Sequence, residues 1–105
     1  MQQDEVWLAD LGGQAGRRPV VILTRSNIIP QLSSLTVMPL TTNVRAIPTH
    51  VRLTRADGMR KECAATADNI GTFEKSVLLY RLAQLSPAKM LEIFHAIHVA
   101  FDMPL

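Results

Sequence analysis

The order of hydrophobic and polar residues predicts short strands followed by one helix. Residues 19–24 form a continuous apolar, β-branched run, which indicates a buried strand. Residues 48–54 alternate apolar and polar side chains, as a half-exposed strand does. Further strands are expected at 5–11, at 35–42, at 62–67 and, within an ambiguous segment at 76–85, around 79–82.

Turn residues separate these strands. Glycines make 12–17 a flexible loop, and the Asp-Gly pair at 57–58 predicts a hairpin turn. Ser26 is expected to cap a short helical turn, which Pro30 limits. Pro39 lies inside a strand-like run and lacks an N–H to give to a neighbouring strand, so it predicts an edge position or a bulge.

The C-terminal segment shows the pattern of an amphipathic helix. Ser86 is a good N-cap residue, and Pro87 suits the first helical position. Apolar residues then recur at helical spacing: Met90, Ile93, Phe94, Ile97 and Phe101. We expect the helix to end near Asp102. The whole pattern predicts a mainly β fold, a small, strongly bent sheet or barrel capped by a C-terminal helix.

The composition fits a single domain over residues 1–105, since 48% of the residues are hydrophobic and 19% are charged. No apolar run approaches the ~20 residues that span a bilayer, and the polar, acidic start is unlike a secretory signal. One cysteine forms no internal disulfide, so we expect a reducing cytoplasm. Aromatic residues, at 5%, are too few for a broad base-stacking platform.

The net charge of +2 conceals an uneven distribution along the chain. Residues 11–61 carry eight basic side chains and one acid, a net of +7, whereas residues 1–10 carry −3 and residues 62–105 carry −2. Seven of those eight bases are arginine, the side chain best suited to holding a phosphate with two hydrogen bonds. This pattern indicates either a solvated basic surface or a groove for a polyanion.

Other candidate sites are weak, and we expect neither a metal nor a cofactor. Four potential metal ligands share a helix face: Glu92, His95, His98 and Asp102. No second helix supplies further ligands, so a polar helix face is the better interpretation. The glycines of the 12–16 loop lack the ending of a phosphate-binding loop. Cys63 is expected in the core rather than as a nucleophile.

Polar side chains gather where the predicted strands begin or end, at the rim of the sheet, which is a common place for chemistry. They are Arg17 and Arg18, Thr41 and Thr42, and His50. Arginine offers a fixed charge, threonine a hydroxyl group, and histidine a proton carrier near neutral pH. The residues by themselves leave open whether they form one site or are separate surface side chains.

Six stretches that include these residues have a familiar order and spacing. They are EVWLADL at 5–11, GRRPVVIL at 16–23, TVMPLTTN at 36–43, IPTHV at 47–51, ADNI at 67–70 and LSPAKM at 85–90. Together they make the chain resemble the MazF/PemK family of bacterial toxins, which are sequence-selective endoribonucleases (mRNA interferases) of toxin–antitoxin pairs.

The resemblance implies a small SH3-like barrel of the MazF/PemK/CcdB type that works as a cytoplasmic homodimer, without a membrane. It also implies cleavage of single-stranded RNA without a metal. The ribose 2′-hydroxyl attacks the adjacent phosphate and leaves a 2′,3′-cyclic phosphate and a 5′-hydroxyl. A cognate antitoxin is expected to place an acidic, otherwise disordered segment over the RNA groove.

The resemblance also assigns residues. Arg18 and Thr41 occupy the catalytic positions, although a shift of one residue would exchange Thr41 for Thr42. We expect Arg18 to stabilise transition-state charge, Thr41 to position the phosphate, and His50 to act as a proton shuttle or RNA contact. The remaining expected RNA-binding residues are Arg17, Arg25, Thr42, Asn43 and Arg45.

Two alternatives of other classes stay open. A gyrase poison of the CcdB type shares the expected fold, but its activity depends on a tryptophan-bearing C-terminal end. Here the chain ends Phe-Asp-Met-Pro-Leu, and its one tryptophan is Trp7. The other alternative is a non-catalytic barrel that binds RNA or a peptide.

Overall fold

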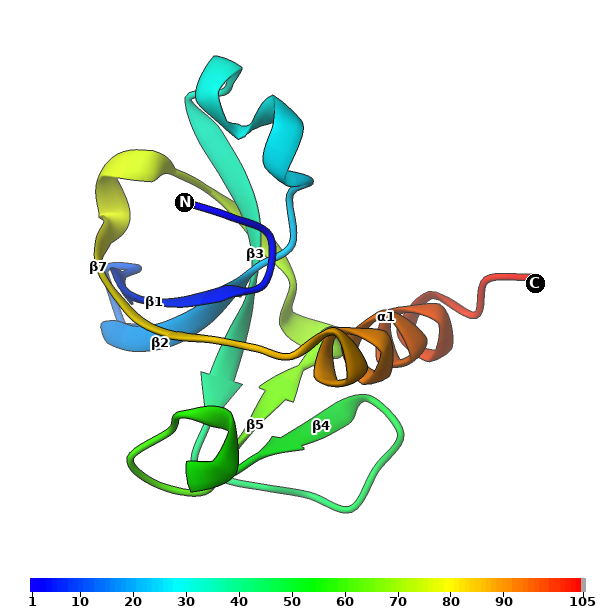
Figure 1. Cartoon of the computed structure of the whole chain (residues 1–105). Helices are drawn as coiled ribbons and strands as arrows, with labels where there is room; N and C mark the ends of the chain where they lie inside the picture. Colours follow the sequence, from blue (N-terminus) through cyan, green and yellow to red (C-terminus); the bar gives the residue numbers. More distant parts are fainter. Residues whose placement is uncertain (105) are drawn as a thin grey trace.

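The computed structural model describes residues 1–104, which form one bent sheet and a C-terminal helix (Figure 1). The strands are β1 (Glu5–Asp10), β2 (Arg17–Ile22), β3 (Ser34–Thr41), β4 (His50–Leu53), β5 (Cys63–Thr66), β6 (Gly71–Glu74) and β7 (Leu78–Gln84). The helix is α1 (Pro87–Phe101). Short 3-10 turns are η1 (Ser26–Gln31), η2 (Arg55–Asp57), η3 (Ala67–Asn69) and η4 (Lys75–Val77).

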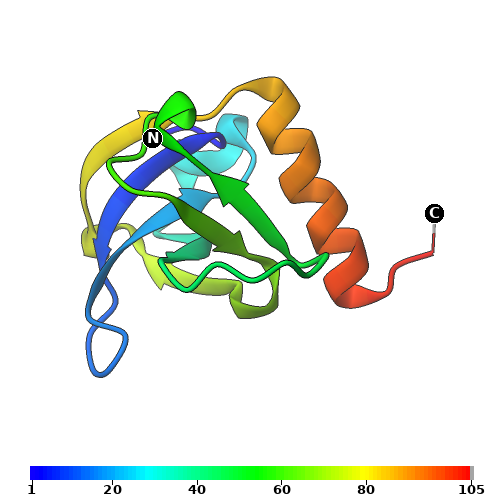
Figure 2. The same ribbon diagram turned by 90° about the horizontal axis from the view of Figure 1, so that it is seen from below.

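All strand pairs are antiparallel, in the order β4-β5-β3-β2-β1-β7. Strand β3 is the centre of the sheet, because it pairs with β2 on one side and with β6 and then β5 on the other. Strands β4 and β7 end the sheet, so it bends like a barrel without closing (Figures 1 and 2). The expected mainly β fold with a C-terminal helix is confirmed.

The core has two parts because successive side chains of a strand face opposite sides of the sheet. Val6 and Val21 join the cluster beneath α1, which contributes Ile93. Their neighbours Trp7 and Val20 belong to the cluster on the other face. The apolar stripe of α1 thus covers one face of the sheet and leaves the other to the strands and short turns.

The helix begins as its sequence predicts. The Ser86 hydroxyl oxygen accepts a hydrogen bond from the Lys89 backbone N–H at 3.1 Å, and Pro87 occupies the first turn. Phe101, expected on the buried face, is 61% exposed, because the last turn of α1 reaches past the sheet (Figure 1). Within residues 1–104, no helix has both the length and the apolar character needed to cross a membrane.

Two local expectations were wrong. Ser26 does not cap η1; its hydroxyl oxygen accepts a hydrogen bond from the Gln3 backbone N–H at 2.9 Å instead. Pro39 is not at an edge, since β3 has neighbours on both sides, and its pairing with Val20 continues the β2–β3 register without a bulge. The Pro39 carbonyl accepts a hydrogen bond from the Thr66 hydroxyl at 2.8 Å, so this side of Pro39 faces the gap between the end of β5 and the start of β6. No ladder bond is lost there.

The remaining differences concern short elements. Strands β4 and β5 form the expected hairpin, but their connection contains η2, and Gly58 closes that turn with φ of 94°. Strand β6 was not anticipated. It is only four residues long and pairs with the first half of β3.

Candidate functional site

A polar pocket of about 330 Å³ opens beside the start of β2, the end of β3 and the start of β4. Its lining residues are Arg18, Thr41, Asn43, Arg45, Ile47, His50, Thr66, Asp68 and Asn69. We call this hollow the arginine pocket. The structure therefore brings together Arg18, Thr41 and His50, which come from three different strands.

The register of β2 and β3 explains why Arg18 and Thr41 meet. Val20 pairs with Pro39, and two further residues along each strand place Arg18 across from Thr41 on the same face of the sheet. Thr42 follows the opposite alternation. It lies with Pro19 in a separate, mainly apolar hollow, so Thr41 shares a pocket with Arg18 and Thr42 does not.

The polar groups of Arg18 and Thr41 are held so that donors remain free. Arg18 Nε donates to the Ala15 carbonyl at 3.2 Å, which leaves the two terminal amino groups of the guanidinium available. The Thr41 hydroxyl oxygen accepts a hydrogen bond from the Asn43 backbone N–H at 3.1 Å, so its own proton is free to be donated. Both side chains can therefore donate to one oxyanion.

One ring nitrogen of His50 is engaged by the backbone. Its Nδ1 accepts a hydrogen bond from the Arg45 backbone N–H at 3.3 Å. A nitrogen that accepts carries no proton, so the neutral imidazole holds its proton on Nε2. In this arrangement His50 offers a hydrogen-bond donor, and the same contact anchors the segment between β3 and β4.

The other wall contains one carboxylate. The Thr49 hydroxyl donates to Asp68 Oδ2 at 2.6 Å, which fixes the Asp68 side chain in the turn that follows β5. Neither Asp68 nor its neighbours Thr66 and Asn69 were expected in the site. The one sequence signal was that polar residues follow the end of a strand within the family-like stretch at 67–70.

Three residues expected to bind RNA lie outside the arginine pocket. Arg17 faces Asp10, with Nε 3.8 Å from Oδ2. Arg25 lines a different hollow beside η1. Thr42 lies in the apolar hollow described above. Asn43 and Arg45, in contrast, line the arginine pocket with Arg18.

Cys63 is buried, as expected. Burial raises the pKa of its thiol, and the nearby carboxylates of Asp57 and Glu62 raise it further. The thiol therefore stays protonated at neutral pH, which disfavours a nucleophilic role. Glu92 forms an ion pair with Lys89 at 3.1 Å, and residues 1–104 contain no group of three His, Cys, Asp or Glu side chains placed to hold a metal ion.

Comparison with known proteins gives consistent results. Residues 2–101 match the model of the family described as the PemK-like, MazF-like toxin of type II toxin–antitoxin systems. The probable endoribonuclease MazF5 of Mycobacterium tuberculosis is 35% identical over 99 residues, which cover 93% of this chain and 90% of that protein. The endoribonuclease MazF3 of the same species is 34% identical, covering 82% and 84% respectively.

Solved structures show the same similarity. The M. tuberculosis toxin MazF-mt6 superposes with a TM-score of 0.89 at 31% identity and covers 96% of this chain and 99% of its own. A mycobacterial endoribonuclease in complex with its cognate antitoxin superposes with a TM-score of 0.87 at 30% identity, covering 100% and 98%.

Proposed function

The chain belongs to the family of PemK-like, MazF-like toxins, and we propose that it is an endoribonuclease that cleaves single-stranded RNA without a metal. The observation that carries this proposal is the meeting of Arg18 and Thr41, each with free donors, in one open pocket beside His50. Such donors fit the non-bridging oxygens of a phosphodiester.

The proposed reaction uses the RNA as its own nucleophile. The ribose O2′ attacks the adjacent phosphorus, the bond from phosphorus to O5′ breaks, and the products are a 2′,3′-cyclic phosphate and a 5′-hydroxyl. Charge builds on the non-bridging oxygens, where the Arg18 guanidinium and the Thr41 hydroxyl stabilise it. Arg18 does not itself move the proton, because a guanidinium holds its protons at neutral pH.

Proton movement falls to other groups in the arginine pocket. Asp68 is the carboxylate among the lining residues, and it can accept the proton of the 2′-hydroxyl and pass it through solvent water to O5′ as that oxygen leaves. His50 acts through its Nε2–H as a donor to the RNA, since its Nδ1 is engaged by Arg45. This geometry favours an RNA contact over a proton shuttle for His50.

The test compares Arg18→Ala with wild-type protein on a long single-stranded RNA in the presence of EDTA. Wild type is expected to give discrete fragments ending in a 2′,3′-cyclic phosphate. The variant should lose about 10²–10³-fold in rate, as when an oxyanion donor is removed. Arg55→Ala, an exposed arginine in η2, serves as the control. Unchanged cleavage by Arg18→Ala would reject the site, and gyrase-dependent DNA breaks would favour the CcdB-like alternative.

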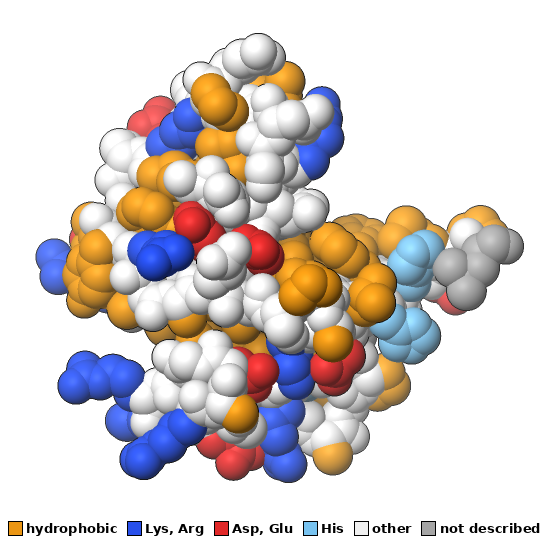
Figure 3. Space-filling view, viewed as in Figure 1, with side chains coloured by type: hydrophobic (Ala, Val, Ile, Leu, Met, Phe, Trp, Pro, Cys, Tyr) orange, Lys and Arg blue, Asp and Glu red, His pale blue; other side chains and the backbone are white. Residues whose placement is uncertain are grey.

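We propose that the chain forms a homodimer through a second surface. A mainly apolar hollow of about 360 Å³ includes Pro19, Met59 and Leu82. Next to it, β7 ends the sheet and exposes Leu79 and Tyr80. Figure 3 shows hydrophobic side chains gathered over β7 on this side of the molecule. An open strand edge beside an exposed apolar patch is typical of an interface between subunits.

We also propose that a cognate antitoxin inhibits the enzyme in the bacterial cytoplasm, with residues 1–105 acting as a single toxin domain. One structural relative was solved in complex with its cognate antitoxin. An acidic, disordered antitoxin segment would complement Arg18 and Arg45 in the arginine pocket and exclude the RNA.

A further inference from the structure

We propose that a groove between β4 and α1 binds the base of a nucleotide next to the cleaved bond. This inference rests on the proposed endoribonuclease function and adds a place where the RNA sequence is read. The groove has a volume of about 550 Å³. Figure 2 shows β4 running alongside α1, so one wall comes from the sheet and the other from the helix.

The groove continues directly from the arginine pocket because His50 lines both hollows. A nucleotide carries its phosphate and its base on opposite sides of one ribose. A phosphate beside Arg18 and a base beside α1 would therefore lie on the two sides of a single imidazole ring. No other hollow described for residues 1–104 shares a lining residue with the arginine pocket.

The walls of the groove suit the flat face of a base. Pro48, two residues before β4, lies on the side of the sheet, and Leu91 and His95 come from successive turns of α1. Leu91 is 69% exposed, more than any other large hydrophobic side chain described. Neither the core nor the proposed dimer surface explains it. An apolar side chain and an imidazole ring can hold a base by stacking.

The charges at the rim are balanced, unlike those of the arginine pocket. Arg52 Nε lies 2.8 Å from the Glu62 carboxylate, and Glu92 lies 3.1 Å from Lys89 Nζ. A phosphate would meet the Glu92 carboxylate here without a free cation to compensate for it. A neutral base fits better. Arg52 retains free N–H donors and Glu92 retains a free acceptor oxygen, and both can form hydrogen bonds with the edge of the base.

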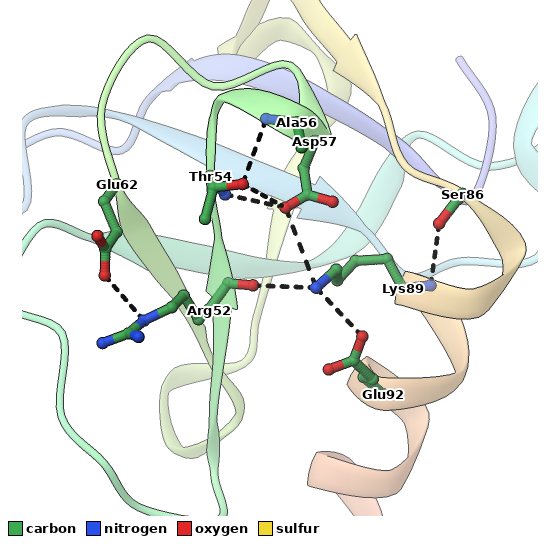
Figure 4. Close-up of polar contacts among 8 residues, drawn as sticks. All are labelled: Arg52, Thr54, Ala56, Asp57, Glu62, Ser86, Lys89 and Glu92. Carbon is green, nitrogen blue, oxygen red and sulfur yellow. Dashed lines mark hydrogen bonds and ion pairs between the residues drawn. The ribbon is translucent and has the colours of Figure 1, made fainter.

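Lys89 makes the groove rigid. Its Nζ donates to the Arg52 carbonyl oxygen at 3.2 Å and lies 4.0 Å from Asp57, while its backbone N–H reaches Ser86 (Figure 4). The Lys89 side chain is only 19% exposed. The first turn of α1 is thereby fastened to the β4 hairpin, and the two walls are held at a constant separation before any RNA arrives.

The experiment combines protein variants with altered RNA. An oligonucleotide with a mapped cut is prepared in two further forms, each with the base removed from one nucleotide that flanks the cleaved bond. Both forms keep the 2′-hydroxyl. For wild type, removal of one of the two bases should lower kcat/KM by about tenfold or more, the scale of a lost stacking contact.

The variants Leu91→Ala and His95→Ala should lower kcat/KM on the intact oligonucleotide and should respond much less to loss of that same base. The matched control is Leu32→Ala, an exposed leucine in another part of the surface (38% exposed). It should behave as wild type with all three RNAs. Since Leu91 is exposed, its removal should leave the thermal unfolding curve unchanged.

Three results separate the hypotheses. If wild type cuts no site in the long single-stranded RNA used to map the cleavage position, the proposed function itself fails. If wild type cleaves, but base removal lowers kcat/KM by the same factor in Leu91→Ala as in wild type, the two effects are independent. Only the base-binding groove is then rejected. If the variants cleave normally and instead bind the antitoxin less tightly, the groove is a protein contact and this inference is overturned.

Discussion

Adjacent residues with the same side chain have different surroundings in this molecule. Thr41 shares the arginine pocket with Arg18, whereas Thr42 lies among apolar groups on the opposite face. We expect Thr41→Val to lower the single-turnover cleavage rate by about tenfold, the scale of one lost hydrogen bond to a charged group. Thr42→Val should retain the wild-type rate, because valine keeps the shape and suits the apolar hollow.

The cleavage rates of both variants are measured with protein in saturating excess over RNA. An effect of Thr42→Val on association of the subunits then does not change the comparison. The two variants have the same change in volume and polarity, one residue apart. A reversal of their effects would mean that the RNA enters from the other face of the sheet. Equal loss in both would contradict the assignment of Thr41.

The sequence predicts part of the site, and the missing part has a physical reason. Arg18 precedes one predicted strand, Thr41 lies near the end of a second and His50 near the start of a third, and such positions gather at the rim of a sheet. Arg17 and Arg25 look equivalent to Arg18 in a list of arginines. Arg17 is separated from Arg18 by the alternation of side chains along β2, and Arg25 by the path of the chain beyond the end of that strand. Neither separation is visible in a list of residue types.

At the level of single elements, the first strand contains a buried charge with an effect on stability. Burial raises the pKa of Glu5, but hydrogen bonds from Trp7 Nε1 and the Gln2 backbone N–H, together with the N-terminal ammonium group and Arg81, outweigh it. The pKa is therefore lowered from its ordinary value of 4.5. The folded state favours the charged carboxylate, so it binds fewer protons than the unfolded state.

This pKa shift predicts the acid response. The contribution of Glu5 to stability is present at neutral pH and is lost as the pH falls below about 4.5 through the folded-state pKa. Glu5→Gln should thus be less stable than wild type at pH 7, and the difference should shrink on acidification. Urea unfolding of both proteins at several pH values measures it. A gap that widens toward low pH would contradict the assignment. Glu74→Gln, an exposed glutamate of β6, is the control.

Elements differ in how well their sequence specifies them. Helix α1 has a cap, a proline at its start and an apolar stripe, all local signals, and its observed bounds follow the expected ones. Strand β6 has four residues and only Phe73 to bury partly, so its pattern is too short to distinguish it from a loop. The place of Pro39 depends on where β3 changes partners, which is a property of the whole sheet.

For the whole molecule, the main question is how the open sheet is completed. Strand β7 pairs only with β1, and its register slips at two places, so that Leu79 and Leu82 have no partner opposite them. Such bulges twist an edge and re-aim its side chains. Leu79 and Leu82 are 41% and 39% exposed beside the apolar hollow. The strand therefore presents apolar side chains outward where an edge strand commonly carries charges.

A charge at this position should separate the subunits. Leu82→Asp would put a carboxylate in place of an apolar side chain in the hollow of the proposed interface, at a cost of several kcal/mol unless it stays in water or pairs with Arg60 or Lys61 at the edge of that hollow. We expect sedimentation analysis to show a dimer for wild type and a monomer for Leu82→Asp, while Leu32→Asp remains dimeric. The monomer should keep its circular dichroism spectrum, because Leu82 is not part of the buried core. A wild-type monomer at micromolar concentration, or a dimer that tolerates this aspartate, would place the interface elsewhere. In that case the exposed leucines of β7 would have to be covered by the antitoxin instead.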